Sequence, residues 1–125
     1  MEYVKSFREL EVYKLSRQLS REIFEVSKKF PKEEMYSLTD QVRRSSRSVG
    51  AQISEAWAKR KYEKHFVSKL TDADGEQAET QHWLAVASDC QYITKEIYEK
   101  YLMKCNSISN MIHSMIKKSH LFCGK

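Results

Sequence analysis

The chain has 125 residues, a formal net charge of +5, three glycines and one proline. This length suits one domain, and so few helix breakers exclude collagen, Pro/Gly-rich disorder and most turn-rich β-sandwiches. No apolar run approaches the roughly 18 residues of a membrane span, the first residues lack the features of a secretory signal, and the three cysteines form no C-x-x-C pair. We therefore expect a cytoplasmic, helical and mildly basic protein.

Apolar residues recur at steps of three and four along the first half of the chain, which is the spacing of amphipathic helices. The first helix is predicted over roughly 8–30 and ends at Phe30-Pro31, because proline disfavours helix at the residue before it. The second is predicted over roughly 37–60 and begins at Ser37-Leu-Thr-Asp40, a short-acid form of the capping box. The predicted buried positions are Val12, Leu15, Leu19, Ile23, Val26 and Phe30, then Leu38, Val42, Ser45, Val49, Ile53 and Ala56 or Trp57.

The second half predicts two further helices, over roughly 63–91 and 95–119, with Thr94 as the cap of the last. The predicted buried positions are Phe66, Leu70, Ala73, Gln77, Thr80, Leu84, Ala87 and Gln91, then Tyr98, Leu102, Cys105, Ile108, Ile112 and Met115. Short connections make consecutive helices antiparallel. The predicted fold is therefore all-α: one domain over 1–125, built as an up-down-up-down four-helix bundle.

Small residues predict places where helix backbones approach closely. Gly50 lies among serines and alanines in the second helix, and Gly75 lies in the third. A glycine within a helix costs up to about 1 kcal/mol relative to alanine, so a packing reason is expected for each. For Gly75 the alternative is a tolerated surface glycine.

No catalytic or metal site stands out. Glu79-Thr-Gln-His82 is a Glu-x-x-His motif, but a di-metal bundle needs a second such motif and two more glutamates, and the fourth helix offers only Asn110-Met-Ile-His113. Cys90 and Cys105 fit small core residues better than nucleophiles. We expect no enzyme activity, no metal and no cofactor.

Three arginines near the middle of the second helix differ in direction. Arg43 and Arg47 are one turn apart and share a face, whereas Arg44 lies about 100° away. The shared face suits phosphate contacts, with salt bridges between helices or subunits as the alternative. Arg44, Glu55 and Glu79 are predicted to make structural polar contacts, because both carboxylates lie amid small or apolar residues and need a partner there.

A second basic group lies where the second helix meets the third, and aromatic residues interrupt it. Cations that contact the phosphate backbone and aromatic rings that stack on unpaired bases are typical of a nucleic-acid-binding surface. The alternative is an ordinary helix end, which often has the same composition. The formal charges of residues 1–30, 31–61, 62–92 and 93–125 are +2, +3, −4 and +4, so the basic segments can face an anionic partner. The candidate nucleic-acid contacts are Arg43, Arg47, Lys59, Arg60, Lys61 and Lys64.

Pieces along nearly the whole chain resemble one bacterial family. The resemblance rests on Phe7-Arg-Glu-Leu10-Glu-Val12-Tyr13, on the stretch from Phe30-Pro31 through Arg43-Arg44 to Glu55-Ala56, and on Ala73-Asp-Gly75 through Trp83-Leu84. These pieces resemble the four-helix bundle proteins encoded in intervening sequences of bacterial large-subunit ribosomal RNA genes. Two positions depart from that pattern, with Gln52 in place of Asn and Ala56 in place of Gly, and both changes favour helix.

The resemblance also implies an assembly and partners. The family is similar to the accessory protein of diversity-generating retroelements, a basic bundle that forms a pentameric ring and works with a reverse transcriptase and nucleic acid. A homopentamer that binds RNA or DNA without catalysis is therefore implied. The alternative is a protein-interaction scaffold that docks an acidic partner such as a polymerase or reverse transcriptase.

Overall fold

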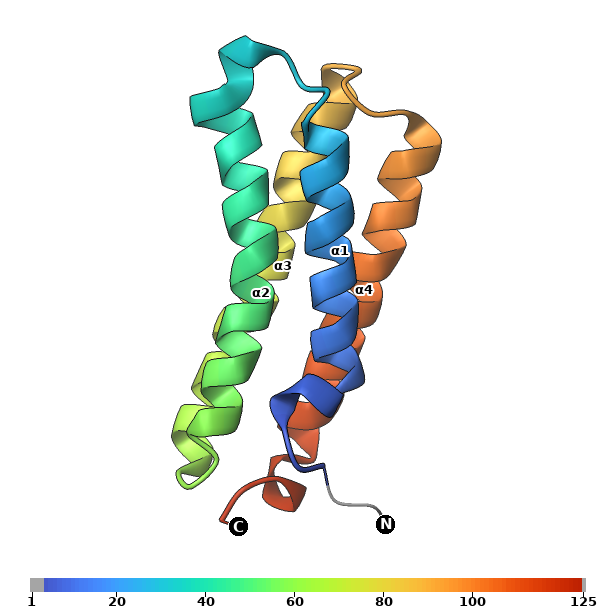
Figure 1. Cartoon of the computed structure of the whole chain (residues 1–125). Coiled ribbons are helices and arrows are strands. Elements are labelled where there is room, and N and C mark those ends of the chain that lie inside the picture. The colour runs from blue at the N-terminus through green and yellow to red at the C-terminus, as the bar shows by residue number, and fades with distance from the viewer. Residues whose placement is uncertain (1–3, 125) are drawn as a thin grey trace.

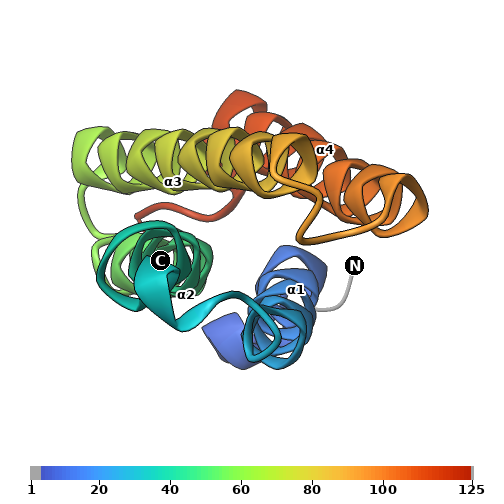
Figure 2. The same ribbon diagram turned by 90° about the horizontal axis from the view of Figure 1, so that it is seen from above.

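The structure is a computed structural model and describes residues 4–124. Its long helices are α1 (Glu11–Ser27), α2 (Asp40–Ala58), α3 (Glu63–Asp89) and α4 (Lys95–Lys117), and no strand occurs within the described range. Consecutive helices are antiparallel, with α1 and α2 in one layer and α3 and α4 in the other (Figures 1 and 2). The predicted all-α four-helix bundle is confirmed. None of the helices between residues 4 and 124 is long and apolar enough to cross a membrane.

The N-terminal end of α1 begins with a capped turn. Phe7–Glu9 forms a 3₁₀ turn in which the Ser6 hydroxyl accepts from the Arg8 N–H at 3.2 Å. The Glu9 carboxylate accepts from the Ser6 N–H at 3.1 Å, which completes a capping box. This turn packs beside α1 and α2, and its Phe7 side chain lines the candidate site described below.

The start of α2 differs from the prediction. No side chain caps this helix, because Met35–Thr39 forms a π-helical turn that runs directly into it. The Asp40 N–H donates to the Met35 carbonyl, so a backbone acceptor replaces the expected cap. The Ser37 hydroxyl instead donates to the Glu34 carboxylate at 2.8 Å. The predicted cap of α4 is confirmed, since the Thr94 hydroxyl accepts from the Ile97 N–H at 3.1 Å.

The predicted apolar stripes form the core. Every predicted position of α2 is buried, and every one of α3 is buried except Gln91, which lies beyond the helix end with a φ of +61°. In α1 the predicted positions Leu15 and Val26 are only partly buried. In α4 the same holds for Tyr98 and Leu102, and the buried residue near the start is Tyr101. The polar seam position Thr80 is fully buried, and its hydroxyl lies 2.9 Å from the Ser45 hydroxyl of α2. This pairing satisfies both groups in the core.

The two helix glycines have different surroundings. A Cβ at Gly50 would lie 3.2 Å from Ser16 Oγ and 3.6 Å from Tyr13 Cε1, so α1 and α2 approach closely there, as predicted. A Cβ at Gly75 would meet nothing within 4 Å, and this residue is exposed. The prediction of a close helix contact at Gly75 is therefore wrong.

Cys90 and Cys105, both predicted to lie in the core, differ in burial. Cys105 is fully buried in α4, and burial raises the pKa of its thiol to about 12. Cys90 is exposed at the C-terminal end of α3, so its predicted place in the core is wrong. The reason is that α3 ends at Asp89, which leaves Cys90 in the turn to α4.

Candidate nucleic-acid interface

Cationic and aromatic side chains gather along one side of the molecule, where α1 and α2 face each other. Steps of three and four place these residues on one edge of each helix. We call this strip the α1–α2 edge. It is defined by Tyr13, Arg17, Ser20 and Phe24 of α1, by Lys28 directly after α1, and by Arg43, Arg47, Gly50, Ala51 and Ser54 of α2.

Three cations surround the Phe24 ring on this edge. The Arg43 and Arg47 guanidinium carbons lie 4.7 and 5.2 Å from the ring centroid, and the Lys28 ammonium lies 4.8 Å from it. Arg43 Nε also donates to the Ser27 hydroxyl at 2.8 Å. The face of an aromatic ring attracts cations, so Phe24 holds these side chains in place without neutralising their charge.

Within residues 4–124, no carboxylate lies within ion-pairing distance of Arg17, Arg43 or Arg47. Lys28 pairs with Glu25 in the last turn of α1, with its ammonium 3.2 Å from the carboxylate and both side chains more than half exposed. Such an exposed pair contributes little, and it competes weakly with an external anion. The three arginines therefore remain available to an anionic partner.

Arg44 has a different environment, on the side of α2 that faces α3. Its guanidinium lies 2.6 Å from Glu79 Oε2 and 3.3 Å from Glu76 Oε2. Trp83 Nε1 also donates to Glu79 at 3.0 Å. The hydrogen bonds from Trp83 and Arg44 lower the pKa of the Glu79 carboxyl. The structure thus brings Arg44 and Glu79 together in a contact between helices.

Glu55 does not share this environment. Half of its side chain is exposed, and its nearest cation is Lys69 at 3.9 Å. The expectation of an internal carboxylate at this position is wrong. Glu55 lies two positions from the buried Ile53 and Trp57, which puts it on the opposite side of α2 from the core.

The remaining predicted phosphate contacts lie far from Arg43 and Arg47. Lys59, Arg60, Lys61 and Lys64 surround the turn between α2 and α3. At 1.5 Å of rise per residue, Lys59 lies about 18 Å along α2 from Arg47. The six candidates therefore form two separate groups and not one surface.

The group at this turn is also partly occupied by structural contacts. The Arg60 guanidinium carbon lies 3.7 Å from the centroid of the Trp57 ring, and its Nε donates to the Trp57 carbonyl at 2.9 Å. The Arg60 carbonyl accepts from the Gly124 N–H at 3.1 Å, which fastens the C-terminal segment there. Lys59, Lys61 and Lys64 are exposed, so they are the free cations of this group among the described residues.

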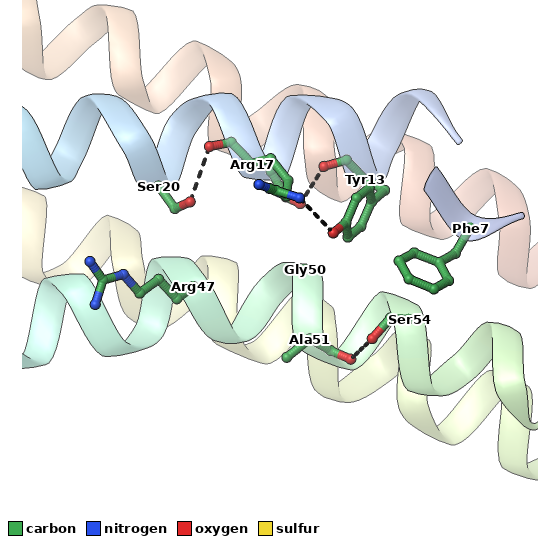
Figure 3. A pocket seen from close by; sticks show the side chains of 9 residues that line it. Phe7, Tyr13, Arg17, Ser20, Arg47, Gly50, Ala51 and Ser54 are labelled. Carbon is green, nitrogen blue, oxygen red and sulfur yellow. Dashed lines mark hydrogen bonds between the residues drawn. The ribbon is translucent and has the colours of Figure 1, made fainter. Parts of the chain in front are cut away.

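A cleft of about 270 Å³ opens on the α1–α2 edge beside the Phe7–Glu9 turn (Figure 3). Gly50 lies between its walls and adds no side chain. Arg17, for which the sequence predicted no role, extends over the cleft and donates to the Tyr13 hydroxyl at 3.2 Å. The residues that line it are Phe7, Tyr13, Ser16, Arg17, Ser20, Arg47, Gly50, Ala51 and Ser54, without any carboxylate.

The Glu-x-x-His motif forms no metal cluster in the described part of the chain. Between residues 4 and 124, no group of three or more His, Cys, Asp or Glu side chains is placed so that it could hold a metal ion. Glu79 is occupied by Arg44 and Trp83, while the exposed His82 ring lies edge-on to Trp83 with centroids 4.7 Å apart.

Comparison with known proteins identifies relatives of this bundle. No curated protein matches the sequence. A solved structure from Bacteroides thetaiotaomicron, described as a protein with unknown function from the S23 ribosomal protein family, is 30% identical and has a TM-score of 0.76. That match covers 85% of this chain and 98% of the other. The family model of the 23S rRNA-intervening sequence protein matches residues 8–114. On this match, which spans most of the bundle, the chain belongs to the 23S rRNA-intervening sequence protein family.

Proposed function

We propose that this protein binds RNA or DNA along the α1–α2 edge, without catalysing a reaction, and that it does so as a homo-oligomer. The observation that carries the proposal is the contrast between neighbouring arginines. Arg44 is neutralised by Glu76 and Glu79, whereas Arg43 and Arg47 surround Phe24 with no carboxylate nearby in the described chain.

Two physical features favour a nucleic-acid backbone as the partner. Guanidinium groups form strong, charge-assisted hydrogen bonds to phosphate, and each phosphate contact releases counterions. The contacts from Phe24 and Ser27 restrict Arg43 before any partner arrives, so less side-chain entropy is lost on binding. A charged, pre-positioned row of donors therefore suits a chain of regularly spaced anions.

The test compares two double variants of equal charge by fluorescence anisotropy with a structured RNA over a salt series. We expect Arg43→Ala/Arg47→Ala to weaken binding by at least about tenfold at low salt. The salt slope should fall by about 2, since two phosphate contacts are removed. The control, Lys95→Ala/Lys117→Ala, removes two exposed cations of α4 and should change affinity far less.

Two further measurements keep this test decisive. The single variant Arg47→Ala leaves the Arg43 contacts with Ser27 in place, and thermal unfolding shows whether each variant is folded. Equal losses in both double variants would mean that binding depends on overall charge and not on the α1–α2 edge. No binding by the unaltered protein at low salt would contradict the proposal and favour a scaffold for an acidic protein.

A further inference from the structure

The cleft beside the Phe7–Glu9 turn has two chemically different ends (Figure 3). Arg47 lies at one end, the Phe7 and Tyr13 rings lie at the other, and Arg17 extends between them. The two rings meet edge to face, with centroids 4.9 Å apart. A ligand that matches this order needs an anionic group at one end and a flat, apolar face at the other.

Two serines offer hydrogen-bond acceptors to a ligand in the cleft: Ser20 of α1 toward the Arg47 end, and Ser54 of α2 toward the aromatic end (Figure 3). The Ser20 hydroxyl donates to the Arg17 carbonyl at 3.1 Å, and the Ser54 hydroxyl donates to the Ala51 carbonyl at 2.7 Å. Each hydroxyl has one proton, so both oxygens retain lone pairs for a ligand N–H or O–H. A ribose hydroxyl or a base edge supplies such donors.

The size of the cleft limits the ligand. Its volume of about 270 Å³ is below the roughly 300–1,000 Å³ of sites for drug-sized molecules. One phosphate-bearing unit therefore fits better than a larger cofactor. A base within a duplex presents only its edges, because its faces are stacked on its neighbours, and so it cannot lie flat on a protein ring.

We infer that the cleft takes one unpaired nucleotide of a single strand, with its phosphate between Arg17 and Arg47 and its base against Tyr13 and Phe7. This inference rests on the proposed function and gives it a substrate class. The α1–α2 edge then binds any backbone through Arg43 and Arg47, while the cleft adds a preference for single-stranded segments.

The test measures anisotropy with a labelled oligouridylate and with an RNA duplex of equal length. Arg17→Gln should weaken binding of the single strand by at least about fivefold and change binding of the duplex by less than about twofold. The matched control is Arg21→Gln, one turn further along α1, exposed and outside the cleft. It should affect both RNAs alike.

A second pair of variants tests the aromatic end. Tyr13→Leu removes the ring and should also lower the affinity for the single strand. Tyr13→Phe keeps the ring and should bind the single strand as tightly as the unaltered protein does. Circular dichroism shows whether Tyr13→Leu is folded, and Arg17→Gln decides the outcome if it is not.

The outcomes separate the two proposals. Two results would contradict the inference that the cleft binds an unpaired nucleotide: Arg17→Gln loses the same affinity for both RNAs, or the unaltered protein shows no preference for the single strand. Either result leaves the proposed function standing. Absence of binding to either RNA would overturn both.

Discussion

The Asp74 carboxylate makes three side-chain hydrogen bonds, two of which join α3 to α4. It accepts from Ser109 Oγ at 2.7 Å and from Gln77 Nε2 at 2.9 Å, and His113 Nε2 lies 3.0 Å from its other oxygen. Burial opposes ionisation of this carboxyl, but the bonds from Ser109, Gln77 and His113 outweigh it and lower the pKa of Asp74. The folded protein therefore favours the charged form of this residue.

This pKa shift predicts a pH-dependent effect of Asp74→Asn. At neutral pH the variant should lose about 1–2 kcal/mol of unfolding free energy, because charge-assisted hydrogen bonds are lost. A carboxyl whose pKa is lowered on folding stabilises the protein above its ordinary value of 3.8, and this contribution disappears as the pH falls through the lower folded value. The difference between the two proteins should therefore shrink below about pH 4.

Urea unfolding at several pH values measures this difference. Asp72→Asn serves as the control, because the Asp72 side chain is more than half exposed and lies 4.0 Å from its nearest cation, Lys69. A stability difference for Asp74→Asn that stays constant on acidification would contradict the role assigned to its charge.

The roles of the arginines of α2 could be separated from the sequence, whereas the role of Arg17 could not. The 100° between successive helix positions already separates Arg44 from Arg43 and Arg47, and the structure places them on different sides of α2. Arg17 could not be assigned in the same way. Its role depends on which edge of α1 meets α2, and only packing decides that. The one available signal was its spacing of a single turn from Tyr13.

At the scale of helices, the two glycines give a matched prediction. Gly75→Ala should raise the unfolding free energy by about 0.5–1 kcal/mol, because alanine restricts the unfolded chain and the new Cβ meets nothing. Gly50→Ala restricts the unfolded chain in the same way, but its Cβ would lie 3.2 Å from Ser16 Oγ. The Ser16 hydroxyl is held there by the hydrogen bond that it donates to the Tyr13 carbonyl at 2.7 Å. It should be less stable than Gly75→Ala.

Chemical denaturation of the two variants, each against the unaltered protein, gives this comparison. Their difference measures how tightly α1 and α2 are packed. Equal gains would show that Ser16 moves aside freely and that the small residue at Gly50 is not required for the approach of the two helices.

Periodicity predicted the interior of each helix better than its ends. The buried stripe of α3 alternates steps of four and three over seven positions that the core covers. The π-helical turn before α2 has no such signal, because it depends on which backbone carbonyl each N–H reaches. In the first half of α4 the buried residue is Tyr101, which lies between Lys100 and Lys104, and both lysines pair with Glu22 of α1. Which residue of α4 meets α1 depends on this packing and not on the spacing within α4.

The charges of the whole molecule follow from this packing. The acidic segment forms α3, and its carboxylates meet cations or polar groups of α2 and α4: Glu76 and Glu79 contact Arg44, and Asp74 contacts His113. These contacts pair the acidic side chains of α3 with groups of α2 and α4, on the side of the bundle away from α1. The α1–α2 edge therefore keeps its positive charge, although the chain as a whole carries only +5.

A charge of +5 per chain binds RNA weakly at physiological salt, so assembly decides whether the proposed function is effective. A ring of five chains, as the sequence resemblance implies, would carry +25. With Arg17, Arg43 and Arg47 on phosphates, each engaged chain should contribute about −2 to the slope of log affinity against log salt for a single strand. We expect a short oligouridylate to show the slope of one chain and a long one a steeper slope. Light scattering on the same samples gives the number of chains per particle. Two results would contradict the idea that several chains of one oligomer bind the same strand: equal salt slopes for the short and the long oligouridylate on an oligomer, or a protein that is monomeric in every sample.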